Sequence, residues 1–156
     1  MAARQRLEKY LQEEGVSFDS MIHSVAYTAQ EVAAAQHTPG GQLAKVVLVD
    51  ADGRLVMLVL PASCRVNFPK VKSVLDAKKV RLAREEEFAG TFTDCEVGAM
   101  PPFGNLYSLP VYVDGSLAEV PEIVFKVGSH TTSMRISFAD YQRLAEPTMA
   151  DFAARP

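Results

Sequence analysis

Two consecutive apolar segments, residues 44–49 and 55–60, constrain the fold more than any other part of the chain. Both are rich in Val and Leu and are apolar on successive residues, a pattern typical of strands covered on both faces. Residues 50–54 separate them, and Gly53 suits the left-handed conformation of a hairpin loop. We therefore predict that this hairpin forms the centre of the sheet.

The rest of the chain mixes short strands with helices and does not alternate them strictly. Capping patterns mark helix starts at Thr28 and at Ser137, and Gly15 is a natural helix stop. This mixture predicts one α+β domain over residues 1–156, with about seven strands. We expect helices near 4–14, 28–37, 69–78, 85–87 and 137–147, and further strands near 18–24, 110–114, 122–127 and 134–136.

Composition excludes several classes of protein. The net charge of −3 is not that of a polycation, so a nucleic-acid site must be a local patch. Cys64 and Cys95 lie far apart, which favours reduced thiols in a cytoplasm. His23, His37 and His130 lack metal-ligand spacing, so we expect no metal.

No apolar run is long enough to cross a bilayer, and residues 1–8 lack the apolar core of an export signal. The chain also lacks the glycine-rich loop that cradles nucleotide phosphates. Its serines and cysteines lie outside recognisable nucleophile motifs. We therefore expect a cytoplasmic protein without a cofactor, and we disfavour ATP-driven and dinucleotide redox chemistry.

The segment Gly98-Ala99-Met100-Pro101-Pro102-Phe103-Gly104 predicts a stiff loop. Proline fixes φ and lacks an N–H donor, whereas the glycines at the two ends allow unusual backbone conformations. Asn105 follows the loop directly. One interpretation is a tight turn between strands, and the other is a binding loop.

Two side chains are candidates for chemistry, and each has a structural alternative. Lys45 begins an apolar strand, so its ammonium either extends past the end of the sheet or faces a cleft, where it would stabilise negative charge. His130 lies in the loop Gly128-Ser129-His130-Thr131. It is either a structural residue or an acid, base or hydrogen-bond partner for a substrate.

A basic segment follows the second strand of the hairpin. It is either a solvated helix face or a phosphate-facing patch in an otherwise acidic molecule. Its members are Lys70, Lys72, Lys78, Lys79, Arg81 and Arg84.

Three motifs in this order resemble the YbaK-like family, free-standing relatives of the editing insertion domain of bacterial prolyl-tRNA synthetases. They are residues 44–49, residues 98–105 and Val127-Gly128-Ser129-His130-Thr131. The resemblance implies a mixed, barrel-like central sheet with flanking helices. It also implies a deacylase that hydrolyses the ester of a mischarged tRNA carrying Cys, Ala, Ser, Thr or another small residue.

The resemblance also assigns roles. Lys45 would engage the terminal adenosine of the tRNA, residues 98–104 would line the amino-acid pocket, and His130 would lie near the substrate. The family needs no catalytic triad, because a terminal hydroxyl of the tRNA is thought to activate water. Met100 and Phe103, with Leu106, would set the pocket size, and a synthetase is a possible partner. The alternatives are a binding module without turnover and a hydrolase of a small non-tRNA ester.

Overall fold

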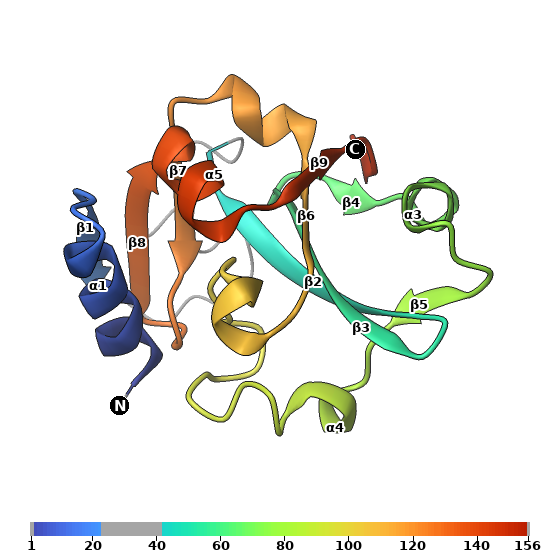
Figure 1. Ribbon diagram of the computed structural model, residues 1–156, viewed down its shortest axis with the longest axis horizontal. Helices are drawn as coiled ribbons and strands as arrows, with labels where there is room; N and C mark the ends of the chain where they lie inside the picture. Colours follow the sequence, from blue (N-terminus) through green and yellow to red (C-terminus); the bar gives the residue numbers. More distant parts are fainter. Residues whose placement is uncertain (1, 23–41, 156) are drawn as a thin grey trace.

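The predicted hairpin lies at the centre of the structure (Figure 1). In the computed structural model, which describes residues 2–22 and 42–155, β2 (Ala44–Ala51) and β3 (Arg54–Pro61) pair antiparallel along their whole length. Asp52 and Gly53 connect them with φ values of 51° and 89°. Two successive left-handed residues give a turn whose twist matches that of the paired strands. The prediction for this segment is confirmed.

The hairpin belongs to a five-stranded mixed sheet in the order β5-β2-β3-β6-β9. β5 (Val80–Leu82) pairs antiparallel with β2 at one edge. On the other side, β6 (Val111–Asp114) runs parallel to β3, and β9 (Thr148–Ala150) runs parallel to β6. β3 is therefore the middle strand.

Two smaller sheets complete the β structure. The first has the order β1-β8-β7, formed by Asp19–Ile22, Thr132–Ser137 and Glu122–Lys126. It meets the start of β2 at a single parallel bridge between Leu43 and Val124. The second pairs β4 (Arg65–Val66) with β10 (Ala153–Ala154).

The α+β class is confirmed, but the prediction of one barrel-like sheet is wrong. The part of the chain described here has ten strands in three sheets, which do not close into a barrel. The physical reason is that β2 and β7 share one bridge and then diverge, so no continuous ladder joins the two larger sheets.

Helices cover the sheets. α1 (Ala3–Glu13) and α5 (Phe138–Ala145) lie on one side, and α3 (Phe68–Leu75) lies on the other (Figure 1). Side chains cap two of them, since Asn67 accepts the Lys70 N–H and Ser137 accepts the Asp140 N–H. Shorter helical turns are α4 (Glu85–Phe88), η1 (Gly104–Tyr107) and η2 (Gly115–Glu119). The helix predicted near 28–37 lies outside the described residues.

Apolar side chains pack on both faces of the hairpin, as its sequence predicts. Ala44 and Leu48 join the main core, which also contains Leu7 of α1 and Tyr141 of α5. Val49 faces the opposite way and joins a second cluster beneath α3. Burial on both faces explains why the two strands carry almost no polar residues.

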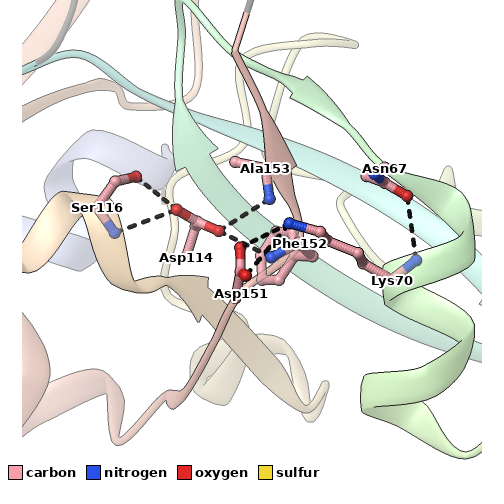
Figure 2. A network of polar contacts seen from close by, with 7 residues as sticks. All are labelled: Asn67, Lys70, Asp114, Ser116, Asp151, Phe152 and Ala153. Carbon is pink, nitrogen blue, oxygen red and sulfur yellow. Dashed lines mark hydrogen bonds and ion pairs between the residues drawn. The ribbon is translucent and has the colours of Figure 1, made fainter.

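A buried carboxylate fastens the C-terminal segment to the sheet (Figure 2). Asp114, at the end of β6, is 5% exposed and accepts the backbone N–H groups of Phe152 and Ala153, each at 2.9 Å. It also accepts the N–H and hydroxyl of Ser116. These four hydrogen-bond donors stabilise the negative charge of Asp114 without a neighbouring cation. Burying a carboxylate costs less free energy when its oxygens are hydrogen-bonded in this way.

Candidate active site

Lys45 lies on the face of β2 that points away from the main core. Its neighbours Ala44 and Val46 pack into the main core, and successive side chains of a strand point to opposite faces. Leu43 belongs to a small cluster with Val124, Met21 and Ala62. Because Leu43 and Lys45 are two residues apart, Lys45 shares this face.

The surroundings of Lys45 destabilise its charge. Burial lowers the pKa of Lys45, the nearby Arg65 lowers it further, and Cys64 partly opposes both effects. Within residues 2–22 and 42–155, no hydrogen bond or ion pair engages its ammonium. A half-buried cation in this state can bind an anionic or carbonyl oxygen with little competition from a protein partner.

A second lysine, Lys126, lies on the same face of the neighbouring strand. The parallel bridge joins Leu43 to Val124, so Lys45 and Lys126 each lie two residues beyond it. Ile123 and Phe125 of β7 point into the main core, which places Lys126 on the opposite face. The sequence analysis did not select Lys126. Its position as the last residue of a strand before the Gly128 loop was the available signal.

His130 is 7% exposed, and both of its ring nitrogens are hydrogen-bonded. Nδ1 lies 2.9 Å from Lys126 Nζ, and Nε2 lies 2.8 Å from the carbonyl oxygen of Val97. An ammonium can only donate and a carbonyl can only accept, so these two contacts fit the tautomer with the proton on Nε2. Both ring nitrogens are thus engaged within the protein, and the acid–base role expected for His130 stays a prediction.

The loop predicted from the two prolines is exposed at its first residue and buried over the rest of its length. Gly98 is exposed with φ +83°, whereas residues 99–104 are buried. Pro101 and Pro102 follow trans peptide bonds, and the Pro102 carbonyl accepts the buried Tyr141 hydroxyl at 2.9 Å. Asn105 Nδ2 donates to the Leu144 carbonyl.

Phe103, at the centre of this loop, is a core residue. It is 0% exposed and makes edge contacts with the rings of Tyr10, Phe125 and Tyr141. Met100 belongs to the same core cluster. The packing of these two side chains anchors the loop to the core, and their expected part in setting the size of the pocket stays a prediction.

Main-chain hydrogen bonds join this loop to the one that carries His130. Gly128 N donates to Ala99 O at 2.7 Å, and Glu96 N donates to Gly128 O at 2.8 Å. Ser129 Oγ bonds within its own loop, to the hydroxyls of Thr131 and Thr132. The structure thus brings together two of the three motifs, around Gly98 and Gly128, through backbone contacts.

Four of the basic residues, Lys72, Lys78, Lys79 and Arg81, lie near the other end of β2, and two members of the basic segment are already paired. Arg81 bonds to Glu87 and Asp50, and Lys70 pairs with Asp151 at 3.2 Å. These contacts hold the pKa of Arg81 above its ordinary value, chiefly through the Glu87 hydrogen bond. The residues lining a surface cavity of about 490 Å³ are Asp50, Asp52, Gly53, Lys72, Lys79, Val80 and Arg81.

At this cavity the Asp52 carboxylate bonds to backbone N–H groups and not to the ammonium groups of the lysines. It accepts the N–H groups of Lys78 and Lys79 at 3.0 and 2.8 Å. The side chains of Lys72, Lys78 and Lys79 have no ion-pair partner among the residues that the structure describes. These three lysines, together with Arg84, therefore carry positive charge that no ion pair among the described residues compensates.

Three further findings limit what the described residues can do. Cys64 and Cys95 are both free thiols, and burial raises the pKa of Cys95 to about 12. Residues 2–22 and 42–155 contain no group of three His, Cys, Asp or Glu side chains placed to hold a metal ion. They also contain no helix that is long and apolar enough to span a membrane. His23 and His37 lie outside the described residues.

Residues 23–144 match the aminoacyl-tRNA editing domain family. This chain belongs to that family. The family expected from the three motifs is therefore confirmed, and membership supports hydrolysis of aminoacyl-tRNA as the activity of the site.

Relatives of this editing domain fall into two groups. The chain is 29% identical over 153 residues to the multifunctional Ser/Thr-tRNA deacylase ProXp-y of Escherichia coli strain K12, covering 95% of this chain and 91% of the relative. It is 32% identical over 131 residues to the proline–tRNA ligase of Acidithiobacillus ferrooxidans, covering 83% of this chain but 22% of the ligase.

Solved structures show the same fold. A protein described as a proposed trans-editing enzyme for prolyl-tRNA synthetase superposes with a TM-score of 0.83 at 22% identity, covering 97% of each chain. A second, described only as a hypothetical protein, has a TM-score of 0.85 at 21% identity, covering 94% of this chain and 98% of the other. At these identities the superpositions support the fold alone.

Proposed function

We propose that this editing domain is a trans-acting aminoacyl-tRNA deacylase in cytoplasmic translation quality control. It would hydrolyse the ester between a tRNA and a small, wrongly attached amino acid of the Cys, Ala, Ser or Thr class. The observation that carries the proposal is the match to ProXp-y over 95% of this chain and 91% of that deacylase. A match over both lengths favours the same stand-alone activity.

Lys45 is the proposed contact to the terminal adenosine of the tRNA. Its ammonium is half-buried, and the described residues do not engage it. A phosphate oxygen would supply an anionic partner, and the ester carbonyl oxygen would supply a neutral acceptor. Its charge would act strongly there, because a partly water-excluded site screens it less than bulk water does.

The attacking water would be activated by the terminal ribose 2′-hydroxyl of the tRNA. This proposal agrees with the hydrogen bonds of His130, which leave no ring lone pair for a substrate. A tRNA ending in 2′-deoxyadenosine should therefore be deacylated far more slowly. Unchanged deacylation of that substrate would rule out this route.

The amino-acid pocket is proposed at the joined loops, with Gly98 and Asn105 at the exposed ends of one and Gly128 and Ser129 in the other. Met100, Pro101, Pro102, Phe103 and Gly104 would fix the shape of this pocket from behind. A hydrophobic pocket discriminates by only about 1–3 kcal/mol per methylene. Small shifts of this support would therefore change which amino acid is edited.

The tRNA would lie along β2. Lys45 is near one end of this strand and Asp50 is near the other, so the cavity lined by Lys72 and Lys79 lies about 17 Å from Lys45 at the usual rise of an antiparallel strand. A bound acceptor arm would place its terminal nucleotide at Lys45 and backbone phosphates near Lys72, Lys78 and Lys79. Lys70 and Arg81 would contribute less, because acidic side chains already compensate them.

A panel of mischarged tRNAs tests the proposal. Purified protein should release amino acid from at least one tRNA carrying Cys, Ala, Ser or Thr, and Lys45→Ala should abolish this release. Lys9→Ala, which removes an exposed lysine on α1, is the matched control and should keep full activity. If every mischarged tRNA remains intact while the protein is folded, the deacylase proposal fails.

A synthetase is the proposed partner, because the ligase relatives carry this domain within a longer chain. Binding to prolyl-tRNA synthetase should be measurable by analytical ultracentrifugation with and without tRNA. Independent sedimentation in both conditions would mean that the enzyme finds its substrate without a synthetase.

A further inference from the structure

A chain of three groups runs from β7 to the exposed turn at Gly98. Lys126 Nζ lies 2.9 Å from His130 Nδ1, and His130 Nε2 lies 2.8 Å from the Val97 carbonyl oxygen. The Glu96 carboxylate accepts the His130 backbone N–H at 3.3 Å and lies 4.0 Å from Nε2. The imidazole therefore connects a rigid strand to the turn through two side-chain hydrogen bonds.

The imidazole also packs directly beneath Gly98. A Cβ atom added to Gly98 would lie 3.4 Å from His130 Cε1, and Gly98 has φ +83°. The turn is thus held by contact with the ring and by the main-chain hydrogen bonds that Gly128 makes with residues 96 and 99. Loss of the ring contact would leave the Val97 carbonyl without its donor.

We infer that Lys126 is a positioning residue for deacylation. Its ammonium selects the His130 tautomer with the proton on Nε2, and this proton is the one that holds the Val97–Gly98 turn. The opposite tautomer would place a lone pair against the Val97 carbonyl and would break the link. His130 accordingly serves the site as a fixed donor and not as a proton acceptor.

This inference rests on the proposed deacylase function, but its first test does not. The two-bond ¹H–¹⁵N spectrum of the imidazoles in the tRNA-free protein at pH 7.5 reports the tautomer of His130. We expect a protonated Nε2 and an unprotonated Nδ1. A His130 ring protonated on Nδ1 would overturn the inference whether or not any mischarged tRNA is hydrolysed.

Kinetics on the mischarged tRNA that the protein deacylates give the second test. Lys126→Met should lower kcat on the order of tenfold, because small displacements of positioning groups have effects of this scale or larger. KM should change less than twofold, since Lys45 and the basic surface still bind the tRNA. Lys126→Arg keeps a cationic donor and should recover most of the lost rate, whereas Lys9→Met should change nothing.

Replacing His130 by glutamine distinguishes a positioning role of this residue from a catalytic role. In His130→Gln the amide nitrogen replaces Nε2 as a donor, so this variant should be clearly more active than His130→Ala. Adding Lys126→Met to His130→Gln should cause little further loss, because the tautomer no longer matters. The inference would be overturned if His130→Gln were as inactive as His130→Ala. It would also be overturned if Lys126→Met reduced the activity of His130→Gln as much as it reduces that of the parent protein. The comparison of the two His130 variants decides the question even if Lys126→Met alone proves unstable.

Discussion

The carboxylate of Asp114 accepts the backbone N–H of Phe152, with 2.9 Å between Oδ1 and N, and so ties the last turn of the chain to the end of β6. The same oxygen accepts the Ala153 N–H. In Asp114→Asn the amide group must turn an N–H toward one set of these donors. We expect the free energy of unfolding to fall by about 1–3 kcal/mol, measured by urea denaturation.

Asp151→Asn is the matched control for this substitution. Its carboxylate is 80% exposed and, among the described residues, pairs only with the exposed Lys70, so its loss should cost less than about 1 kcal/mol. Equal destabilisation by the two substitutions would show that the Asp114 hydrogen bonds are not what holds the tail.

The same carboxylate predicts a dependence of stability on pH. Burial raises the pKa of Asp114, but the hydrogen bonds from Ser116, Phe152 and Ala153 outweigh it and hold this pKa below the ordinary value. Its contribution is therefore complete above about pH 4, the ordinary value for an unfolded chain, and disappears as the pH falls through the lower folded value. Urea midpoints from pH 6 to pH 2.5 should decline less steeply in Asp114→Asn than in the parent protein.

Lys45→Met should stabilise the fold while it removes the activity. Burial lowers the pKa of Lys45, which means that folding disfavours its charged form. Met keeps the length and apolar stem of the side chain without the charge. We expect a urea midpoint equal to or above that of the parent protein, together with loss of deacylation. A marked fall in the midpoint would indicate that the ammonium stabilises the fold.

The uncompensated lysines should dominate the salt dependence of tRNA binding. The double substitution Lys72→Ala and Lys79→Ala should reduce the slope of log Kd against log salt by about 0.7–0.9 for each lost phosphate contact. Lys70→Ala is the comparison, because Asp151 already pairs with that ammonium. Filter binding from 50 to 300 mM KCl measures both. An unchanged slope in the double variant would show that these lysines are only a solvated face.

Tyr141→Phe should loosen the buried loop. The Tyr141 hydroxyl is buried and donates to the Pro102 carbonyl at 2.9 Å, so Phe leaves that carbonyl without a partner. We expect a loss of about 1–3 kcal/mol in the free energy of unfolding. Tyr112→Phe, on the other side of the sheet, is a control that should cost less. Hydrogen exchange at residues 98–104 should accelerate only in Tyr141→Phe.

The main elements could be predicted because local patterns specify them. The hairpin, α1, α5 and the Ser137 cap all follow from residue periodicity or short capping motifs. β4, β5, β9 and β10 are two or three residues long, too short to show a period. Their partners are distant in sequence, as in the parallel pairing of β6 with β9, so tertiary contacts specify them.

In the candidate site, too, some features could be predicted from the sequence and others depend on tertiary contacts. Lys45, His130 and the two-proline loop could be selected from residue type and from the family resemblance. The hydrogen bond between Lys126 and His130 could not, because it depends on the 128 loop turning back over the end of β7. Likewise, the pairing of Arg81 with Asp50 joins residues 31 positions apart and becomes visible only when β5 and β2 align.

Main-chain atoms, not side chains, form the bonds between Gly128 and the turn at residues 96–99. Because main-chain atoms make these bonds, the side chains of the turn can be substituted without breaking them. Val97, whose side chain is 51% exposed, can accordingly vary in size or polarity while its carbonyl keeps the same place. Natural lineages, and libraries randomised at this codon, would thus have a route to change the surface beside the proposed amino-acid pocket while the scaffold stays unchanged.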